Sequence, residues 1–193
     1  MTARVSARKP RVATPVLEQA PARNTLVHTI ILGLDPSLRG TGYGVIEVGR
    51  PHPRALAHGT ISSSTTWPHS RCLASISQSI REVLRKYRPT VCAVEGLFFA
   101  QNLQTAIVMG EARGAALAAI AEAGLEIYEI APRKVKQAIV GYGAAQKFAV
   151  AKMVQRMLQL DEMPAADAAD ALALALAHAQ DQGRYRLTAP RRI

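Results

Sequence analysis

Cysteine is scarce in this chain, which contains only Cys72 and Cys92. Cys92 falls in an apolar, strand-like run, and Cys72 falls on an expected helix. We therefore expect two buried thiols rather than a disulfide or a pair of metal ligands. This cysteine usage points to a reducing cytoplasm as the compartment.

Long apolar runs are also missing. No run approaches the ~20 residues of a transmembrane helix, and no apolar core of a signal peptide is visible. Acidic residues are few, 14 against 24 Lys and Arg, so the net charge is +10 and the pI is about 10.2. A balance this basic favours a polyanionic partner, with nucleic acid ahead of a membrane surface.

The 193 residues, 49% of them hydrophobic, suffice for one domain with a substantial core. Residues 1–28 carry five basic side chains, one acid and three prolines without any period, which predicts a disordered basic tail. That tail either contacts DNA phosphates, acts as an organelle transit peptide, or is dispensable. We expect the folded domain over 29–181 and a basic C-terminal tail over 182–193.

Hydrophobic periodicity predicts an α/β domain with a mixed sheet, because three strands in a row precede alternating helices and strands. The segment 131–143 reads as a loop or a short helix. The expected strands are 30–34, 41–48, 55–61, 91–97 and 125–130, and the expected helices are 73–86, 103–122, 146–160 and 164–180.

Two pairs of glycines suggest close approaches. Gly42 and Gly44 lie on one face of the second expected strand, where the backbone of a ligand has room to approach. Gly110 and Gly114 lie on one face of the 103–122 helix and allow a neighbouring element or a second subunit to pack closely. Of these two options, packing within the chain is the one we favour.

Asp35 ends the buried strand 30–34, and a carboxylate in that position is costly to desolvate unless something pairs with it. The alternative is that Asp35 merely opens a turn before Pro36, which is common. Glu95 is a second acid within an apolar strand.

Asp167 and Asp170 are three residues apart, so they share one face of a helix that is otherwise almost entirely Ala and Leu. The helix dipole accounts for one acid in the first turn but less well for two, since like charges at this spacing repel. Together with Asp35 and Glu95 they form a set of hard oxygen ligands that suits Mg²⁺ or Mn²⁺. Four carboxylates can bracket two ions ~3.5–4 Å apart, which predicts a metal-dependent nuclease.

Several motifs, in order along the chain, resemble the bacterial RuvC family of Holliday-junction resolvases. The resemblance runs from Ile30 to His178. Its motifs are Gly33-Leu-Asp-Pro-Ser-Leu-Arg-Gly-Thr-Gly-Tyr-Gly44, Val94-Glu-Gly-Leu-Phe98, Ala112-Arg-Gly114, Val135-Lys-Gln137 and Ala166-Asp-Ala-Ala-Asp-Ala-Leu-Ala173.

The resemblance implies an RNase H-like fold, with a mixed five-stranded sheet flanked by helices. It implies a homodimeric endonuclease that uses two Mg²⁺ ions per active site, with Mn²⁺ as a substitute. Each subunit nicks one of two opposed strands of a four-way junction and leaves 5′-phosphate and 3′-hydroxyl ends. The RuvA–RuvB branch-migration complex is the implied partner. The implied catalytic and metal-binding acids are Asp35, Glu95, Asp167 and Asp170.

The same resemblance places Phe98 where an aromatic stacks on bases near the junction centre, with core packing as the alternative. Lys136 and Lys147 fall on basic residues near the scissile strand, with solvated lysines as the alternative. One departure is Ser37-Leu38, where the family commonly has Gly-Ser, and this difference bears on the turn beside Asp35.

Two other functions stay open at the level of the sequence. One is another RNase H-like nuclease, such as a ribonuclease H. The other is a DNA-junction binding protein without catalysis, although binding alone needs none of the four acids. His178 has no supported catalytic role, and we expect it to pack or cap the end of the last helix.

Overall fold

The computed structural model describes residues 29–96, 102–182 and 190–193. Its strands form one mixed sheet in the order β3-β2-β1-β4-β5-β6. The strands are β1 (Ile30–Asp35), β2 (Gly40–Glu47), β3 (Arg54–Ser62), β4 (Val91–Glu95), β5 (Glu126–Ile130) and β6 (Arg191–Arg192). The helices are α1 (His69–Tyr87), α2 (Leu103–Glu122), α3 (Pro132–Val140), α4 (Lys147–Leu158) and α5 (Ala166–Asp181).

β1 lies at the centre of this sheet because its residues are apolar on both faces. It pairs antiparallel with β2 and parallel with β4, and β4 pairs parallel with β5. The α1 and α2 crossovers that parallel pairing requires join β3 to β4 and β4 to β5. The carboxyl ends of β1 and β4 consequently meet at one edge of the sheet.

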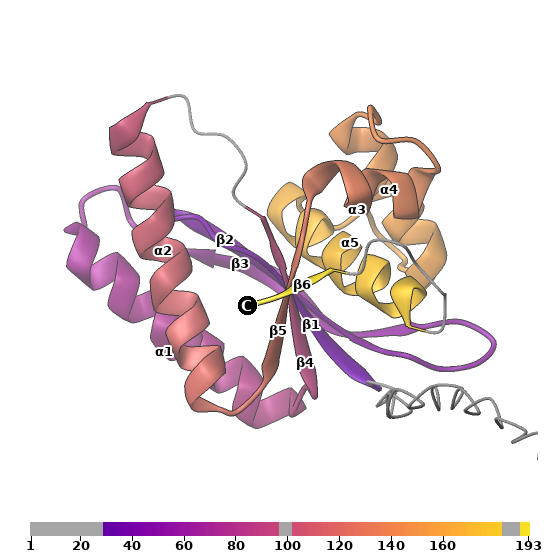
Figure 1. The fold of residues 1–193 in the computed structure, drawn as a ribbon, viewed down its shortest axis with the longest axis horizontal. Helices are drawn as coiled ribbons and strands as arrows, with labels where there is room; N and C mark the ends of the chain where they lie inside the picture. The colour runs from indigo at the N-terminus through magenta and orange to yellow at the C-terminus, as the bar shows by residue number, and fades with distance from the viewer. Residues whose placement is uncertain (1–28, 97–101, 183–189) are drawn as a thin grey trace, which may run out of the picture.

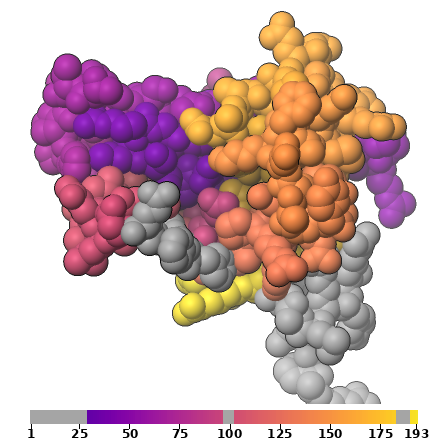
Figure 2. Space-filling view, turned by 90° about the horizontal axis from the view of Figure 1, so that it is seen from above, coloured from indigo at the N-terminus to yellow at the C-terminus, as the bar shows by residue number. Residues whose placement is uncertain are grey.

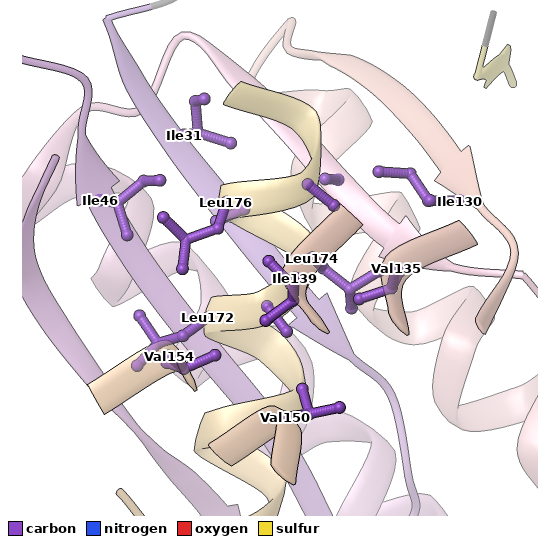
Figure 3. Close-up of a cluster of buried hydrophobic side chains, with 14 of the residues drawn as sticks. Ile31, Ile46, Ile130, Val135, Ile139, Val150, Val154, Leu172, Leu174 and Leu176 are labelled. Atoms are coloured by element: carbon purple, nitrogen blue, oxygen red, sulfur yellow. The ribbon is translucent and has the colours of Figure 1, made fainter. Parts of the chain in front are cut away.

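Helices cover both faces of the sheet (Figure 1). On one face α1 and α2 pack together, and their apolar residues form a core with Leu32 and Leu34 of β1. On the other face α5 lies against β1 and β2, with α3 and α4 outside it. Leu172, Leu174 and Leu176 of α5 fill this second core, as the close-up in Figure 3 shows.

The α/β class with a mixed sheet is confirmed, but the sheet has six strands where five were expected. The additional strand, β6, lies in the segment expected to be a basic tail. It pairs antiparallel with β5, and Arg192 forms an ion pair with Glu126 at 2.7 Å. An otherwise open edge of β5 explains why so short a segment is held there. The segment 131–143 contains the helix α3.

Cys72 and Cys92 are both buried free thiols, as expected. Within the described ranges, no helix has the length and apolar character needed to cross a membrane.

The prediction that Gly110 and Gly114 pack closely within the chain is wrong. A Cβ placed on either glycine would meet no atom of the described residues within 4 Å. The two glycines lie on the outer side of α2, in line with the exposed Leu103 and Ile107. The core packing of α2 instead comes from its inner residues, among them Ala112 and Ala116.

Candidate active site

Asp35 and Glu95 lie side by side at the sheet edge. Leu34 is paired with Val94 in the parallel β1–β4 register, so the next residue on each strand is an acid. The two carboxyl groups are close enough to share a hydrogen bond. Asp35 ends its strand as expected, whereas Glu95, expected within a strand over 91–97, ends β4 and so lies beside Asp35.

α5 brings Asp167 and Asp170 to the same place because it lies directly on a glycine surface of β1 and β2. This surface consists of Gly33, Gly42 and Gly44, and the register puts Gly33 opposite Gly44. A Cβ at Gly33 would overlap the carbonyl oxygen of Ala171, and a Cβ at Gly44 would lie 2.7 Å from Leu172 Cδ2.

Gly42 completes this surface, and a Cβ there would overlap the carbonyl oxygen of Asp167. The close approach expected at Gly42 and Gly44 therefore exists. The element that approaches is α5, however, and not the backbone of a ligand. The glycines are part of the site because they let α5, and with it Asp167, lie flat on the strands.

Burial and mutual repulsion dominate the electrostatics of the four acids. Desolvation, followed by the charge of neighbouring Asp35, raises the pKa of Glu95 to about 7. Desolvation also raises the pKa of Asp35, and the charges of Asp170 and Asp167 add to that rise. At neutral pH the Asp35–Glu95 pair therefore holds a proton part of the time.

Lys147, at the first position of α4, is the cation of this cluster. Its Nζ lies 2.8 Å from Oδ2 of Asp170, and its side chain is 76% exposed. The hydrogen bond to Asp170, followed by the charge of that acid, raises the pKa of Lys147. The family resemblance predicts Lys147 near the scissile strand, and its ion pair with Asp170 is a contact that the sequence did not predict.

The residues present fit a hard divalent cation. Four carboxylates converge from three elements, no Cys or His lies among them, and their repulsion is what a 2+ ion relieves. In the arrangement shown, no three His, Cys, Asp or Glu side chains of the described residues are grouped tightly enough to hold one ion. The ion pair of Lys147 with Asp170 offsets part of this negative charge.

This cluster predicts a pH dependence of folding stability in the presence of a chelator. Because the pKa of Glu95 is raised from 4.5 to about 7, the folded chain binds this proton more tightly than the unfolded chain. The contribution of this proton to the free energy of unfolding is fully present below about pH 4.5 and is lost as the pH rises through about 7. We expect the difference in unfolding free energy between wild type and Glu95→Gln to decrease as the pH rises from 5 to 8. Urea unfolding in EDTA measures this difference. A difference that stays constant over this range would contradict the paired carboxyls.

The turn after Asp35 is intact although Ser37-Leu38 differ from the Gly-Ser that is common in the resembled family. Ser37 does not need a left-handed backbone, since among the described non-glycine residues only Arg88 and Gln159 have positive φ. Thr41 Oγ1 donates to the Ser37 carbonyl at 2.6 Å and accepts from the Ser37 backbone N–H at 3.2 Å. Leu38 is buried in the core beneath α1.

Arg113 is a residue to which sequence reasoning assigned no role. It is buried on α2, its Nη1 donates to the backbone carbonyl of Glu95, and its Nη2 donates to Glu129 Oε2 at 2.5 Å. Arg113 thus fixes the strand end that carries a catalytic candidate. The available signal was a single basic residue inside a helix of small side chains.

The remaining predicted residues have different outcomes. Phe98 lies outside the described residues. Lys136 is half-buried on α3 and, unlike Lys147, forms no ion pair with the four acids. His178 is buried near the C-terminal end of α5, with its ring centroid 4.9 Å from that of Tyr128, so the prediction of a packing role is confirmed.

Comparison with known proteins places this geometry in a family context. The family model described as "Crossover junction endodeoxyribonuclease RuvC" matches residues 31–178. A curated protein of that name from Akkermansia muciniphila is 47% identical over 148 residues, which cover 77% of this chain and 89% of the relative. Its counterpart from Chromohalobacter salexigens is 46% identical over 157 residues, with coverages of 81% and 84%.

Among solved structures, T. thermophilus RuvC in complex with Holliday junction substrate is similar to this chain, with a TM-score of 0.74 and 40% sequence identity. The match covers 79% of this chain and 93% of that protein. The family-model match over residues 31–178 includes the strands and the helix that carry the four acids.

Proposed function

The chain belongs to the RuvC family of crossover junction endodeoxyribonucleases, and we propose that it resolves four-way DNA junctions with the four carboxylates at the β1–β4 edge. Its relative from T. thermophilus is described with a Holliday junction substrate. The single observation that carries the proposal is the convergence of Asp35, Glu95, Asp167 and Asp170, with Lys147 beside them.

We assign the binding of two Mg²⁺ ions, or Mn²⁺ in their place, to Asp35, Glu95, Asp167 and Asp170. In-line hydrolysis of a phosphodiester needs a more acidic water and a neutralised leaving oxygen, and two such ions, when bound, supply both. Asp35, which interacts with Glu95 and with both α5 acids, would be one of the carboxylates that hold the ions. The products are 5′-phosphate and 3′-hydroxyl ends.

The basic side chains near this site serve to hold DNA. Lys147 is exposed and presents its ammonium at the rim of the acidic cluster, where a phosphate of the scissile strand can contact it. We assign a second phosphate contact to Lys136 on α3 and base stacking to Phe98, which lies outside the described residues. Both assignments rest on the family motifs.

We propose that the outer side of α2 is the contact between two copies of the chain. Leu103 is 77% exposed and Ile107 is 52% exposed, which is unusual for large apolar side chains. They continue into Gly110 and Gly114, where no atom lies near enough to prevent the close approach of a second helix. In the face seen in Figure 2, α2 lies on one side and the α3–α4 pair on the other.

A substitution at Gly114 tests this contact without threatening the fold. We expect Gly114→Leu to shift the protein from dimer to monomer in sedimentation velocity, because the new side chain occupies the surface of the partner helix. Among the described residues no atom lies within 4 Å of a Cβ at Gly114, and leucine stabilises the helix by up to about 1 kcal/mol relative to glycine. Lys152→Leu, on the exposed side of α4, is the matched control and stays dimeric. A Gly114→Leu protein that remains a dimer places the contact elsewhere.

Cleavage of a labelled synthetic four-way junction tests the function itself, with and without Mg²⁺ and beside a linear duplex of the same sequence. Paired, symmetric, metal-dependent nicks confined to the junction are the expected result. Equal cutting of the duplex would remove the junction specificity. Preference for an RNA–DNA hybrid would indicate a ribonuclease H, and binding without cutting in Mg²⁺ or Mn²⁺ would indicate a binding protein.

Cellular context follows from the family resemblance. We expect the chain to act in the cytoplasm, where its two buried thiols stay reduced. We also expect it to associate with the RuvA–RuvB branch-migration complex. Co-purification with that complex on junction DNA is the measurement that addresses the partner.

A further inference from the structure

A small pocket opens beside the acidic cluster, between the start of α4 and the segment that leads into α5. Its volume is about 170 Å³. Lys147 and Asp170 form one wall, and Phe148, Met163, Pro164 and Ala169 form most of the rest. The pocket therefore shares this wall with the candidate active site.

The other walls are apolar and belong to neither hydrophobic core. Phe148 is 64% exposed and Met163 is 44% exposed, although both are large apolar side chains. Neither packs into the core beneath α5, to which the next turns of α4 contribute Val150 and Val154. Exposed aromatic and thioether groups beside a charged site are more typical of a binding surface than of a structural element.

The size and chemistry of the pocket indicate its occupant. It is smaller than the roughly 300–1,000 Å³ of pockets that hold drug-sized ligands, so it suits one flat ring. A phenyl ring stacks on the face of any base, and a thioether packs against that face. Neither contact depends on the hydrogen-bonding groups at the edge of the base. The Lys147 ammonium at the rim is placed to meet the phosphate of the same nucleotide.

We propose that this α4–α5 pocket receives one unstacked nucleotide of the strand being cut, with its base against Phe148 and Met163. The proposal rests on the proposed junction cleavage and adds a base-holding site to it. The base is held next to the acidic cluster, so it sets the register of the strand at the scissile phosphate. The contact is tolerant of base identity, because no hydrogen-bonding side chain other than Lys147 and Asp170 lines the pocket among the described residues.

The test compares exposed aromatic residues inside and outside the pocket. We expect Phe148→Ala to lower kcat/KM for junction cleavage by on the order of tenfold or more, and Phe148→Trp to retain activity. Because Phe148 is largely exposed, neither variant is expected to change the folding stability. Tyr142, which is 56% exposed and lies outside the pocket, provides the matched control Tyr142→Ala, expected to cut as wild type does.

A double-mutant cycle that combines a protein substitution with a change in the DNA identifies the base that contacts Phe148. Abasic sites placed one at a time around the scissile phosphate are expected to reveal one position whose effect disappears in Phe148→Ala. If wild type and Phe148→Ala cut the junction equally well, the proposed base-holding pocket is wrong while the proposed function stands. Equal losses of cleavage in Phe148→Ala and Tyr142→Ala contradict the pocket in the same way. Wild type that cuts no junction overturns the proposed function, so the two failures are distinguishable.

Discussion

Asp35→Asn is expected to reduce junction cleavage by about three orders of magnitude or more while leaving junction binding within a few-fold of wild type. Asparagine keeps the shape of the side chain but removes its charge and one hard oxygen ligand. Asp35 interacts electrostatically with Glu95, Asp167 and Asp170, so its loss affects the whole set. Binding persists because phosphate contacts come from Lys and Arg.

The measurement pairs single-turnover cleavage in Mg²⁺ with binding of a labelled junction in EDTA. Asp161→Asn is the matched control, because Asp161 is an exposed acid outside the site, and we expect it to cut as wild type does. An Asp35→Asn protein that cuts at the wild-type rate would show that the chemistry lies elsewhere. Equal loss of cutting in Asp161→Asn would indicate a dependence on net charge rather than on the site.

Gly42→Ala is expected to lower cleavage by about 10²-fold and stability by about 1–3 kcal/mol, although it adds only one methyl group. Gly42 does not have a positive φ, so alanine suits its backbone. The added Cβ overlaps the carbonyl oxygen of Asp167 and comes within 3.1 Å of its Cβ. α5 must therefore shift away from the sheet, and Asp167 and Asp170 shift with it.

Cleavage kinetics and urea unfolding of Gly42→Ala measure the two effects. Gly49→Ala is the control, since the nearest atom to a Cβ at Gly49 lies 3.7 Å away. We expect that variant to match wild type in both measurements. A fully active and fully stable Gly42→Ala would mean that α5 is not held against β2 as closely as the structure shows.

The local parts of the site could be predicted from the sequence. An apolar run that ends in an acid identifies β1 with Asp35, because burial on two faces leaves a continuous hydrophobic signature. A second apolar run identifies β4, although Glu95 was expected inside a strand over 91–97 and instead ends it. Two acids three apart on an Ala- and Leu-rich helix identify α5 in the same way. These inferences depend only on residues close together in the chain.

The long-range parts could not be predicted, because no periodic pattern records which elements meet. The glycines at 42 and 44 predicted the close approach of a ligand backbone, but the element that approaches them is α5, which also contacts Gly33. β6 has two residues and no strand pattern, and its position depends on an open sheet edge and on Glu126. The role of Arg113 could not be predicted either, because its partners lie 16 and 18 residues away in the chain, on two strands.

The placement of Asp167 and Asp170 on α5 also matters while the chain is being synthesised. Asp35 and Glu95 emerge from the ribosome well before residues 166–181. Because Leu172, Leu174 and Leu176 of α5 fill the core on one face of the sheet, we expect the domain to complete its folding only after α5 has been synthesised. We therefore expect a ribosome-bound chain to be unable to cut DNA until this last helix docks onto the glycines at 33, 42 and 44.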